Sequence, residues 1–135
     1  MNKGKVLAID YGTRRVGIAT GDLELKMAFP RTIIENKGNL LDDILGFVNE
    51  LDVKLIVIGL PLNMEEGHKE NPIMKDVVKL VEELEKEGLQ VETVDERLSS
   101  FEAEGLTKPP KKGYNRRLDA HAAQIILQRY FDNLS

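Results

Sequence analysis

The order in which two kinds of hydrophobic pattern follow each other constrains the fold of this chain most. Three apolar segments typical of strands come first, with short connections between them: residues 6–9, 16–20 and 27–34. After residue 39, apolar residues at helical spacing alternate with short apolar runs, in the order helix, strand, helix, strand, helix. This order indicates an antiparallel meander followed by parallel strands with right-handed crossovers. We expect an α/β fold with a five-stranded mixed sheet and helices on both faces.

Helix-capping and helix-breaking residues bound the later elements. Gly38 and Asn39 precede a helix expected over 40–51, and Gly88 ends a helix expected over 74–84. The other expected elements are strands over 55–58 and 89–94 and a final helix over roughly 115–131. These bounds leave no linker long enough to separate two domains, so we expect one domain over residues 1–135.

Two features of the meander predict its turns and its edge. Gly21 and Asp22 are typical of a hairpin turn between the second and third strands. Pro30 lies inside the third strand, and a proline there lacks the N–H that a sheet needs. The third strand is therefore predicted to lie at an edge of the sheet or to carry a bulge.

Composition excludes several kinds of chemistry. The chain has no Cys, which rules out disulfides, thiolate nucleophiles and cysteine-based metal sites, and its two His are far apart in sequence. No apolar run is long enough for a membrane helix or a signal peptide, so we expect a cytoplasmic protein without membrane contact. A bound metal would need carboxylate oxygens.

The charge is unevenly distributed along the chain. The net charge of -4 argues against a general nucleic-acid coating protein. The segment 108–117 nevertheless has no acid and contains five basic residues: Lys108, Lys111, Lys112, Arg116 and Arg117. Such a run is either a solvated loop or a surface for phosphates.

Acidic residues stand where predicted strands end. Asp10 closes the first strand, and Asp95 and Glu96 close the last one. Ligands of open α/β sheets bind beyond the carboxyl ends of the strands, so these acids are candidates for a shared site. Asp95 and Glu96 are adjacent and face opposite ways, so only one of them points to the side of Asp10. The alternatives are a turn-forming role for Asp10 and a helix-capping role for the other two.

The final helix contributes a third acid. Ala122, Ala123 and Ile126 lie within about 60° of Asp119 around a helix, so Asp119 falls on the face that docks on the sheet. An acid on an apolar docking face is uncommon without a partner. His121 lies on roughly the opposite side and is expected at the surface.

Converging carboxylates suit Mg²⁺ or Mn²⁺, because only oxygen ligands are available. A pair of such ions is an established arrangement for displacement at phosphodiesters. The candidates for binding the flanking phosphates are Arg14, Arg97 and the basic segment, including Lys111, Lys112, Arg116 and Arg117. Ser99 and Ser100 have no candidate base nearby in sequence and are expected to cap a helix.

Four motifs, in order along nearly the whole chain, resemble the YqgF family, also called RuvX. They are Asp10-Tyr11-Gly12 with Arg15, Gly17 and Ala19; residues 59–63, Gly-Leu-Pro-Leu-Asn; residues 95–100, Asp-Glu-Arg-Leu-Ser-Ser; and Asp119 with Ala122-Ala123 and residues 126–130. The family usually has Thr-Thr where this chain has Ser99-Ser100, which keeps the hydroxyls.

The resemblance implies a ribonuclease-H-like fold related to the resolvase RuvC, with a magnesium-dependent acidic site. Bacterial members are described as nucleases that mature the 5′ end of pre-16S ribosomal RNA, and older descriptions call them Holliday-junction resolvases. Carried over by position, the three acids of the family fall on Asp10, Glu96 and Asp119. Asp95 remains an alternative to Glu96.

We therefore expect a metal-dependent nuclease acting on precursor rRNA. Branched DNA is the alternative substrate, and symmetric junction cleavage would favour a dimer. The oligomeric state is expected to be a monomer or a weak dimer. A non-catalytic RNA-binding module of ribosome assembly is a further alternative. Residues 10–13, Asp-Tyr-Gly-Thr, also resemble the phosphate loop of actin-type and sugar-kinase ATP-binding proteins, but those proteins need two such domains.

Overall fold

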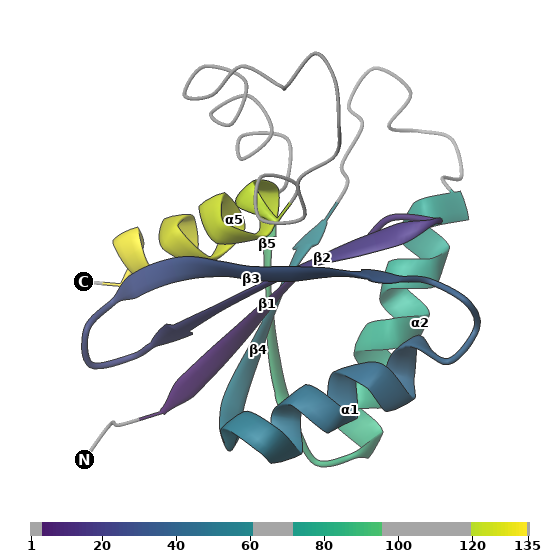
Figure 1. Ribbon diagram of the computed structural model, residues 1–135, viewed down its shortest axis with the longest axis horizontal. Coiled ribbons are helices and arrows are strands. Elements are labelled where there is room, and N and C mark those ends of the chain that lie inside the picture. The colour runs from purple at the N-terminus through teal and green to yellow at the C-terminus, as the bar shows by residue number, and fades with distance from the viewer. Residues whose placement is uncertain (1–3, 61–71, 96–119, 135) are drawn as a thin grey trace.

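The computed structural model of the protein describes residues 4–60, 72–95 and 120–134, which form one five-stranded sheet with helices packed on it (Figure 1). The elements along the chain are β1 (Lys5–Asp10), β2 (Arg15–Asp22), β3 (Met27–Glu35), α1 (Leu40–Leu51), β4 (Val53–Leu60), α2 (Pro72–Lys86), β5 (Gln90–Asp95) and α5 (His121–Asp132). The strand order is β3-β2-β1-β4-β5. β1 pairs antiparallel with β2 and parallel with β4, which confirms the predicted mixed sheet.

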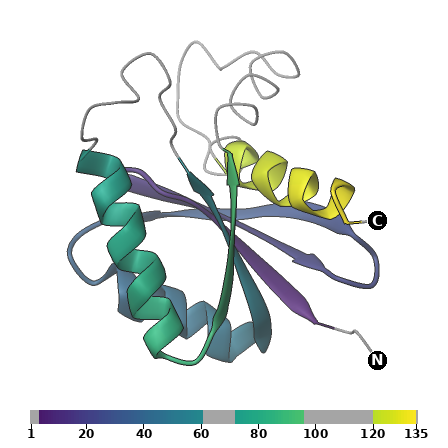
Figure 2. The same cartoon turned by 180° about the vertical axis from the view of Figure 1, so that it is seen from behind.

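The two faces of the sheet are covered by different helices, as predicted. Leu7 and Ile9 of β1 belong to a buried cluster with residues of α1 and α2. Val6 and Ala8 alternate with them and belong to a second cluster with α5. Figure 1 and the view from behind in Figure 2 show α5 on one side of the sheet and α1 and α2 on the other.

Small residues let α5 lie close to the sheet. Ala8, Ala19 and Ala28 form the strand side of this contact, and Phe131 is the largest buried side chain of α5. A Cβ on Gly21 would lie 2.8 Å from Cε2 of Phe131, so this position of β2 has no room for a larger residue. The close approach buries apolar surface on both sides, which is the main source of stability for this contact.

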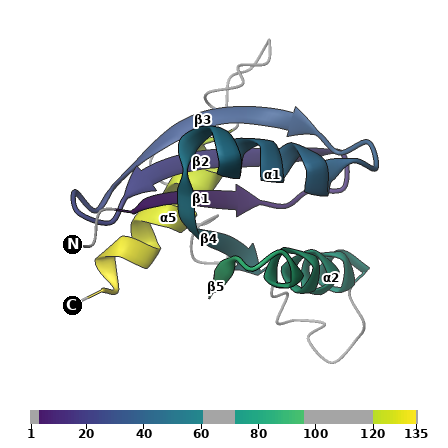
Figure 3. The same ribbon diagram turned by 90° about the horizontal axis from the view of Figure 1, so that it is seen from below.

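The sequence of the edge strand β3 and its contacts with α5 limit the backbone groups that it leaves open. Pro30 pairs with Ala19, and a bulge shifts the register between Ile18 and Ala19, so both parts of the proline prediction are confirmed. The Gln124 amide donates to the Ala28 carbonyl at 3.0 Å. The Gln128 amide accepts from the Ala28 N–H at 3.0 Å and donates to the Lys26 carbonyl at 3.0 Å. Figure 3 shows α5 crossing the meander on this side. These amides satisfy backbone groups that an edge strand otherwise leaves open to another chain.

The hairpin turn lies later than predicted. Gly21 and Asp22 belong to β2, where they pair with Ala28 and Met27, and residues 23–26 make the turn. The Asp22 carboxylate accepts hydrogen bonds from the backbone N–H groups of Glu24 and Leu25, which explains the acid at this place. The prediction of a turn at Gly21 is wrong because this glycine makes room for α5.

The capping and breaking residues identified in the sequence lie at the observed ends of α1 and α2. Asn39 is the N-cap residue of α1, although its side chain makes no capping hydrogen bond. Gly88 has a φ of 89° two residues after the end of α2, a conformation that favours glycine. Residues 115–119 of the expected final helix lie outside the described residues, and α5 begins at His121. Among the helices of the described ranges, none is long and apolar enough to cross a membrane.

Candidate active site

The carboxyl ends of three parallel strands meet at one edge of the sheet. Ile9 of β1 pairs with Ile58 of β4, and Leu60 of β4 pairs with Asp95 of β5. Asp10 follows Ile9 directly, so Asp10 and Asp95 end the two strands that flank β4. The N-terminal end of α5 points to the same edge, as Figures 1 and 2 show. This edge is where α/β sheets bind ligands.

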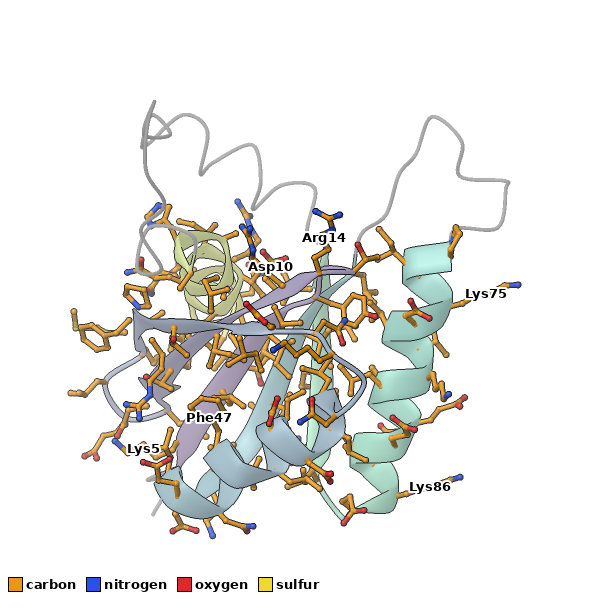
Figure 4. All side chains as sticks on the ribbon, turned by 45° about the vertical axis from the view of Figure 1, so that its right-hand side comes forward. Lys5, Asp10, Arg14, Phe47, Lys75 and Lys86 are labelled. Carbon is orange, nitrogen blue, oxygen red and sulfur yellow. The ribbon has the colours of Figure 1, made fainter. Side chains whose placement is uncertain are left out.

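The Asp10 side chain is placed by strand alternation. Val6 and Ala8 face α5, and Asp10 follows them at the same spacing of two, so its carboxylate lies on the α5 face of the sheet edge. Asp10 is half-buried, whereas the four residues before it are fully buried. Figure 4 shows Asp10 near this edge and Arg14 projecting beyond it. A carboxylate at this place is accessible from outside and has apolar residues directly behind it.

The turn between β1 and β2 carries both Asp10 and Arg14, and it is tied down from the end of β3. The Asn36 side-chain amide donates to the Gly12 carbonyl at 3.0 Å, and the Asn36 backbone N–H donates to the Arg14 carbonyl at 2.9 Å. A Cβ on Gly12 would collide with the Arg15 carbonyl oxygen, so the turn requires glycine there. The glycine of the Asp10-Tyr11-Gly12 motif is thus explained by steric fit.

Tyr11 ties the same turn to α2. Its hydroxyl donates to the Asp76 carboxylate at 3.2 Å, and its ring packs against the cluster between the sheet and α2. Burial raises the pKa of Tyr11, a hydrogen bond with Asn36 opposes this rise, and the Asp76 carboxylate adds to it. The net effect keeps the hydroxyl protonated, so it remains a donor to Asp76.

A groove of about 430 Å³ lies beside Tyr11, between the start of α1 and α2. Its lining includes the carboxylates of Asp42, Asp76 and Glu83 and one cation, Lys79. Acids outnumber bases here, so this groove is unsuited to phosphate groups. The phosphates of a nucleic acid would be expected at the Arg14 side instead.

A family model described as "RuvX: Holliday junction resolvase" matches residues 4–133 of this chain. The chain belongs to the RuvX family. Curated relatives named "Putative pre-16S rRNA nuclease" match this chain over most of its length. The relative from Chloroflexus aggregans is 37% identical over 98% of this chain and 96% of its own. The relative from Cupriavidus necator is 37% identical over 96% of this chain and 89% of its own. These names confirm the expected relationship to nucleases.

Solved structures of more distant proteins have a similar fold. RuvC of T. thermophilus in complex with a Holliday junction substrate has a TM-score of 0.58 and 12% identity, covering 95% of this chain and 93% of RuvC. The yeast mitochondrial Holliday junction resolvase Ydc2 has a TM-score of 0.54 and 10% identity, covering 93% of this chain and 77% of Ydc2. At this identity the likeness concerns the fold alone, and it confirms the expected ribonuclease-H-like sheet.

The structure describes two of the predicted site residues of this chain. Asp10 and Arg14 lie at the strand-end edge and on the turn that follows it. The other predicted residues lie outside the described ranges and stay predictions: Glu96, Asp119, Arg97, Lys111, Lys112, Arg116 and Arg117. The backbone of Asp95 ends β5.

His121 is half-buried rather than at the surface as expected. Its Nδ1 lies 3.1 Å from Oε1 of Gln124, whose amide nitrogen is bound to the Ala28 carbonyl. Its Nε2 is buried without a hydrogen-bond partner among the described residues. Helical projection placed His121 away from the sheet, but its ring lies beside Gln124, whose amide binds β3.

A divalent metal fits Asp10 as one ligand. Its carboxylate is a hard oxygen donor at an accessible strand end, which Mg²⁺ prefers. Over residues 4–60, 72–95 and 120–134, no three side chains of His, Cys, Asp or Glu gather as metal ligands do. The other ligands of a metal bound by Asp10 would therefore have to include side chains beyond those ranges, where Glu96 and Asp119 are found.

Sequence reasoning missed Asn36, Tyr11 and Asp76 as parts of this site. Asn36 follows the end of β3, and Asp76 lies on the exposed side of α2. The sequence predicted no role for Tyr11 beyond its place in the family motif. The one available signal was the position of Tyr11 directly after the candidate acid, because neither of its partners is close in sequence.

Proposed function

We propose that this RuvX protein is a metal-dependent nuclease that hydrolyses phosphodiester bonds in the 5′-end maturation of pre-16S ribosomal RNA. One observation carries the proposal: in a chain of this family, Asp10 ends β1 at the edge where the parallel strands of the sheet end. A half-buried acid at this accessible edge suits a site that binds a cation and a phosphate together.

Asp10, Glu96 and Asp119 are the proposed metal-binding and catalytic residues, with Asp95 as the alternative to Glu96. Two Mg²⁺ or Mn²⁺ ions, when bound there, supply activation of water and neutralisation of charge on the leaving oxygen. Asp10 contributes one carboxylate to this site. Arg14 projects beyond the same edge and binds a phosphate next to the scissile bond, which orients the strand without reading its bases. Arg97 and the basic segment with Lys111, Lys112, Arg116 and Arg117 extend this phosphate-binding surface.

Precursor rRNA is the favoured substrate over branched DNA. Relatives with the rRNA nuclease name are 35–38% identical to this chain over nearly its whole length. The solved junction-resolving enzymes share only 10–12%. RNA cleavage also needs no two-fold symmetry, so a single domain over residues 1–135, acting as a monomer or weak dimer in the cytoplasm, suffices.

The test is cleavage of precursor 16S rRNA, with a four-way DNA junction beside it, each with and without Mg²⁺. We expect a product from the RNA only in the presence of Mg²⁺. Asp10→Asn should lower the rate at least about 100-fold, since it removes a charge that the metal requires. The matched control is Asp132→Asn, an exposed acid near the end of α5, which should cleave like the unmodified protein.

The outcomes separate the candidate functions. Cleavage of the junction alone would favour the resolvase, and salt-sensitive RNA binding without any metal-stimulated product would favour a binding module. Undiminished turnover by Asp10→Asn, with contaminating nuclease excluded, would refute the site.

A further inference from the structure

We propose that Asn36 is a positioning residue for the active site, which holds the turn carrying Asp10 and Arg14 in the geometry that metal and phosphate require. The inference rests on the proposed function, because it assigns a role toward the same metal site. Asn36 touches no reacting group in this role. It acts through the backbone of the turn.

Asn36 binds the turn at two places. Its side-chain amide donates to the Gly12 carbonyl at 3.0 Å, and its backbone N–H donates to the Arg14 carbonyl at 2.9 Å. Glu35, the residue before it, pairs with Arg15, so the backbone bond extends the β2–β3 ladder by one step. The side chain binds the carbonyl of Gly12, two residues after Asp10 and the end of β1. One residue thus connects both sides of the turn.

Strand pairing within the described sheet ends before this turn. Asp10 pairs with Gly17, and residues 11–14 lie beyond that pair and outside any strand. Gly12 adds conformational freedom to this segment. Without the Asn36 amide, the Gly12 carbonyl would lose its protein partner, and the backbone after Asp10 would be free to shift.

Tyr11 and Asp76 complete the arrangement from the other side. The Tyr11 hydroxyl donates to Asp76 of α2 at 3.2 Å. The turn is therefore held between Asn36 at the end of β3 and Asp76 of α2. Metal ligands need positions accurate to fractions of an ångström, and residues that orient ligands commonly change metal affinity 10- to 100-fold when they are lost.

The experiment measures Mg²⁺ binding without substrate, by the amide NMR signals of Gly12, Arg15 and Gly17 during a Mg²⁺ titration. We expect Asn36→Ala to raise the half-saturating Mg²⁺ concentration about 10-fold. The cleavage rate at saturating Mg²⁺ should fall by a smaller factor, because the metal ligands themselves are intact. Asn39→Ala is the matched control, since Asn39 lies three residues on and makes no side-chain capping bond.

A purely structural role predicts a different result. Asn36→Ala would then lower the folded fraction while the half-saturating Mg²⁺ concentration stayed equal to that of Asn39→Ala, and the inference would be overturned. If Mg²⁺ leaves these amide signals unchanged in the unmodified protein, the metal site itself fails and the proposed function falls with it.

A second variant keeps the test decisive if Asn36→Ala does not fold. Tyr11→Phe keeps the ring and its packing and removes the bond to Asp76, and it should raise the half-saturating Mg²⁺ concentration roughly threefold, a smaller effect because Asn36 remains. Tyr130→Phe is its control, as another half-buried tyrosine that lies on α5. Equal Mg²⁺ titrations of the two tyrosine variants would contradict the proposed arrangement.

Discussion

Side-chain amides bind the backbone at both ends of the meander, but the contacts around these amides differ between the two ends. At the far end, Gln124 and Gln128 bind the backbone of β3 at Ala28 and Lys26. At the site end, Asn36 binds the turn at Gly12 and Arg14. Gln124 and Gln128 lie beside the buried face of α5. Asn36 lies at the rim of the sheet, near the hydrogen bond between Tyr11 and Asp76.

The difference separates stability from function in this molecule. Packing of α5 against small strand residues contributes far more free energy than any one amide bond, because apolar burial scales with area. At the site end, the proposed role of the hydrogen bonds is to position Asp10 and Arg14. Changes at the far end should therefore alter unfolding, and changes at the site end should alter metal binding.

The largest expected effect is a loss of stability when the packing of α5 at the far end is disturbed. Phe131→Ala removes a fully buried ring and leaves a cavity beside Gly21 and Leu127, which should lower the free energy of unfolding by about 3–5 kcal/mol. Chemical denaturation measures this loss. The half-saturating Mg²⁺ concentration of the molecules that remain folded should not change, and a tenfold change would break the comparison.

A smaller effect is expected from the amides at the far end. Gln128→Ala removes the bonds to the Ala28 N–H and the Lys26 carbonyl, and water can replace them at this exposed edge. The free energy of unfolding should fall by about 1 kcal/mol, as measured by thermal or chemical denaturation. Gln90→Ala, at an exposed position of β5, serves as the control and should have no measurable effect. Loss of Mg²⁺ binding in Gln128→Ala would show that the two ends are not independent.

The smallest effect concerns pH. Burial raises the pKa of Tyr11 above its ordinary value of 10.0 in the folded protein. Above pH 10 the unfolded chain loses this proton first, so the stabilising contribution is present below pH 10 and is lost as the pH rises through the folded pKa. Unfolding measured from pH 9 upward should therefore show a weaker loss of stability in Tyr11→Phe than in the unmodified protein. Identical slopes for the two would contradict the burial of this hydroxyl.

Local sequence patterns predicted the elements of this fold well. Period-two and helical spacing placed every strand and helix described, and Pro30 correctly marked the edge strand with its bulge. Gly21 was misread, because a glycine before an aspartate has the same local appearance in a turn and beneath a packed helix. Only the contact with Phe131 distinguishes the two cases.

The candidate site was predicted in part. Strand-end position predicted Asp10, and the topology agrees with it, since β1, β4 and β5 end at the same edge. The roles of Glu96 and Asp119 depend on the family resemblance and remain predictions. Asn36 was not predicted, because an asparagine after a strand is common in loops and nothing nearby in sequence indicates which carbonyl it binds.

The amino-acid sequence by itself determined the kinds and order of the elements, the absence of thiol chemistry and the acid at the end of β1, because these depend on side-chain type and on spacing within a few residues. The tertiary structure alone decided which groups hold that acid in place. Tyr11 and Asp76 are 65 residues apart, and Asn36 lies 24 residues from Gly12. Hydrogen bonds of this kind act over about 3 Å and form only once the sheet has brought their partners together, so no local pattern in the chain encodes them.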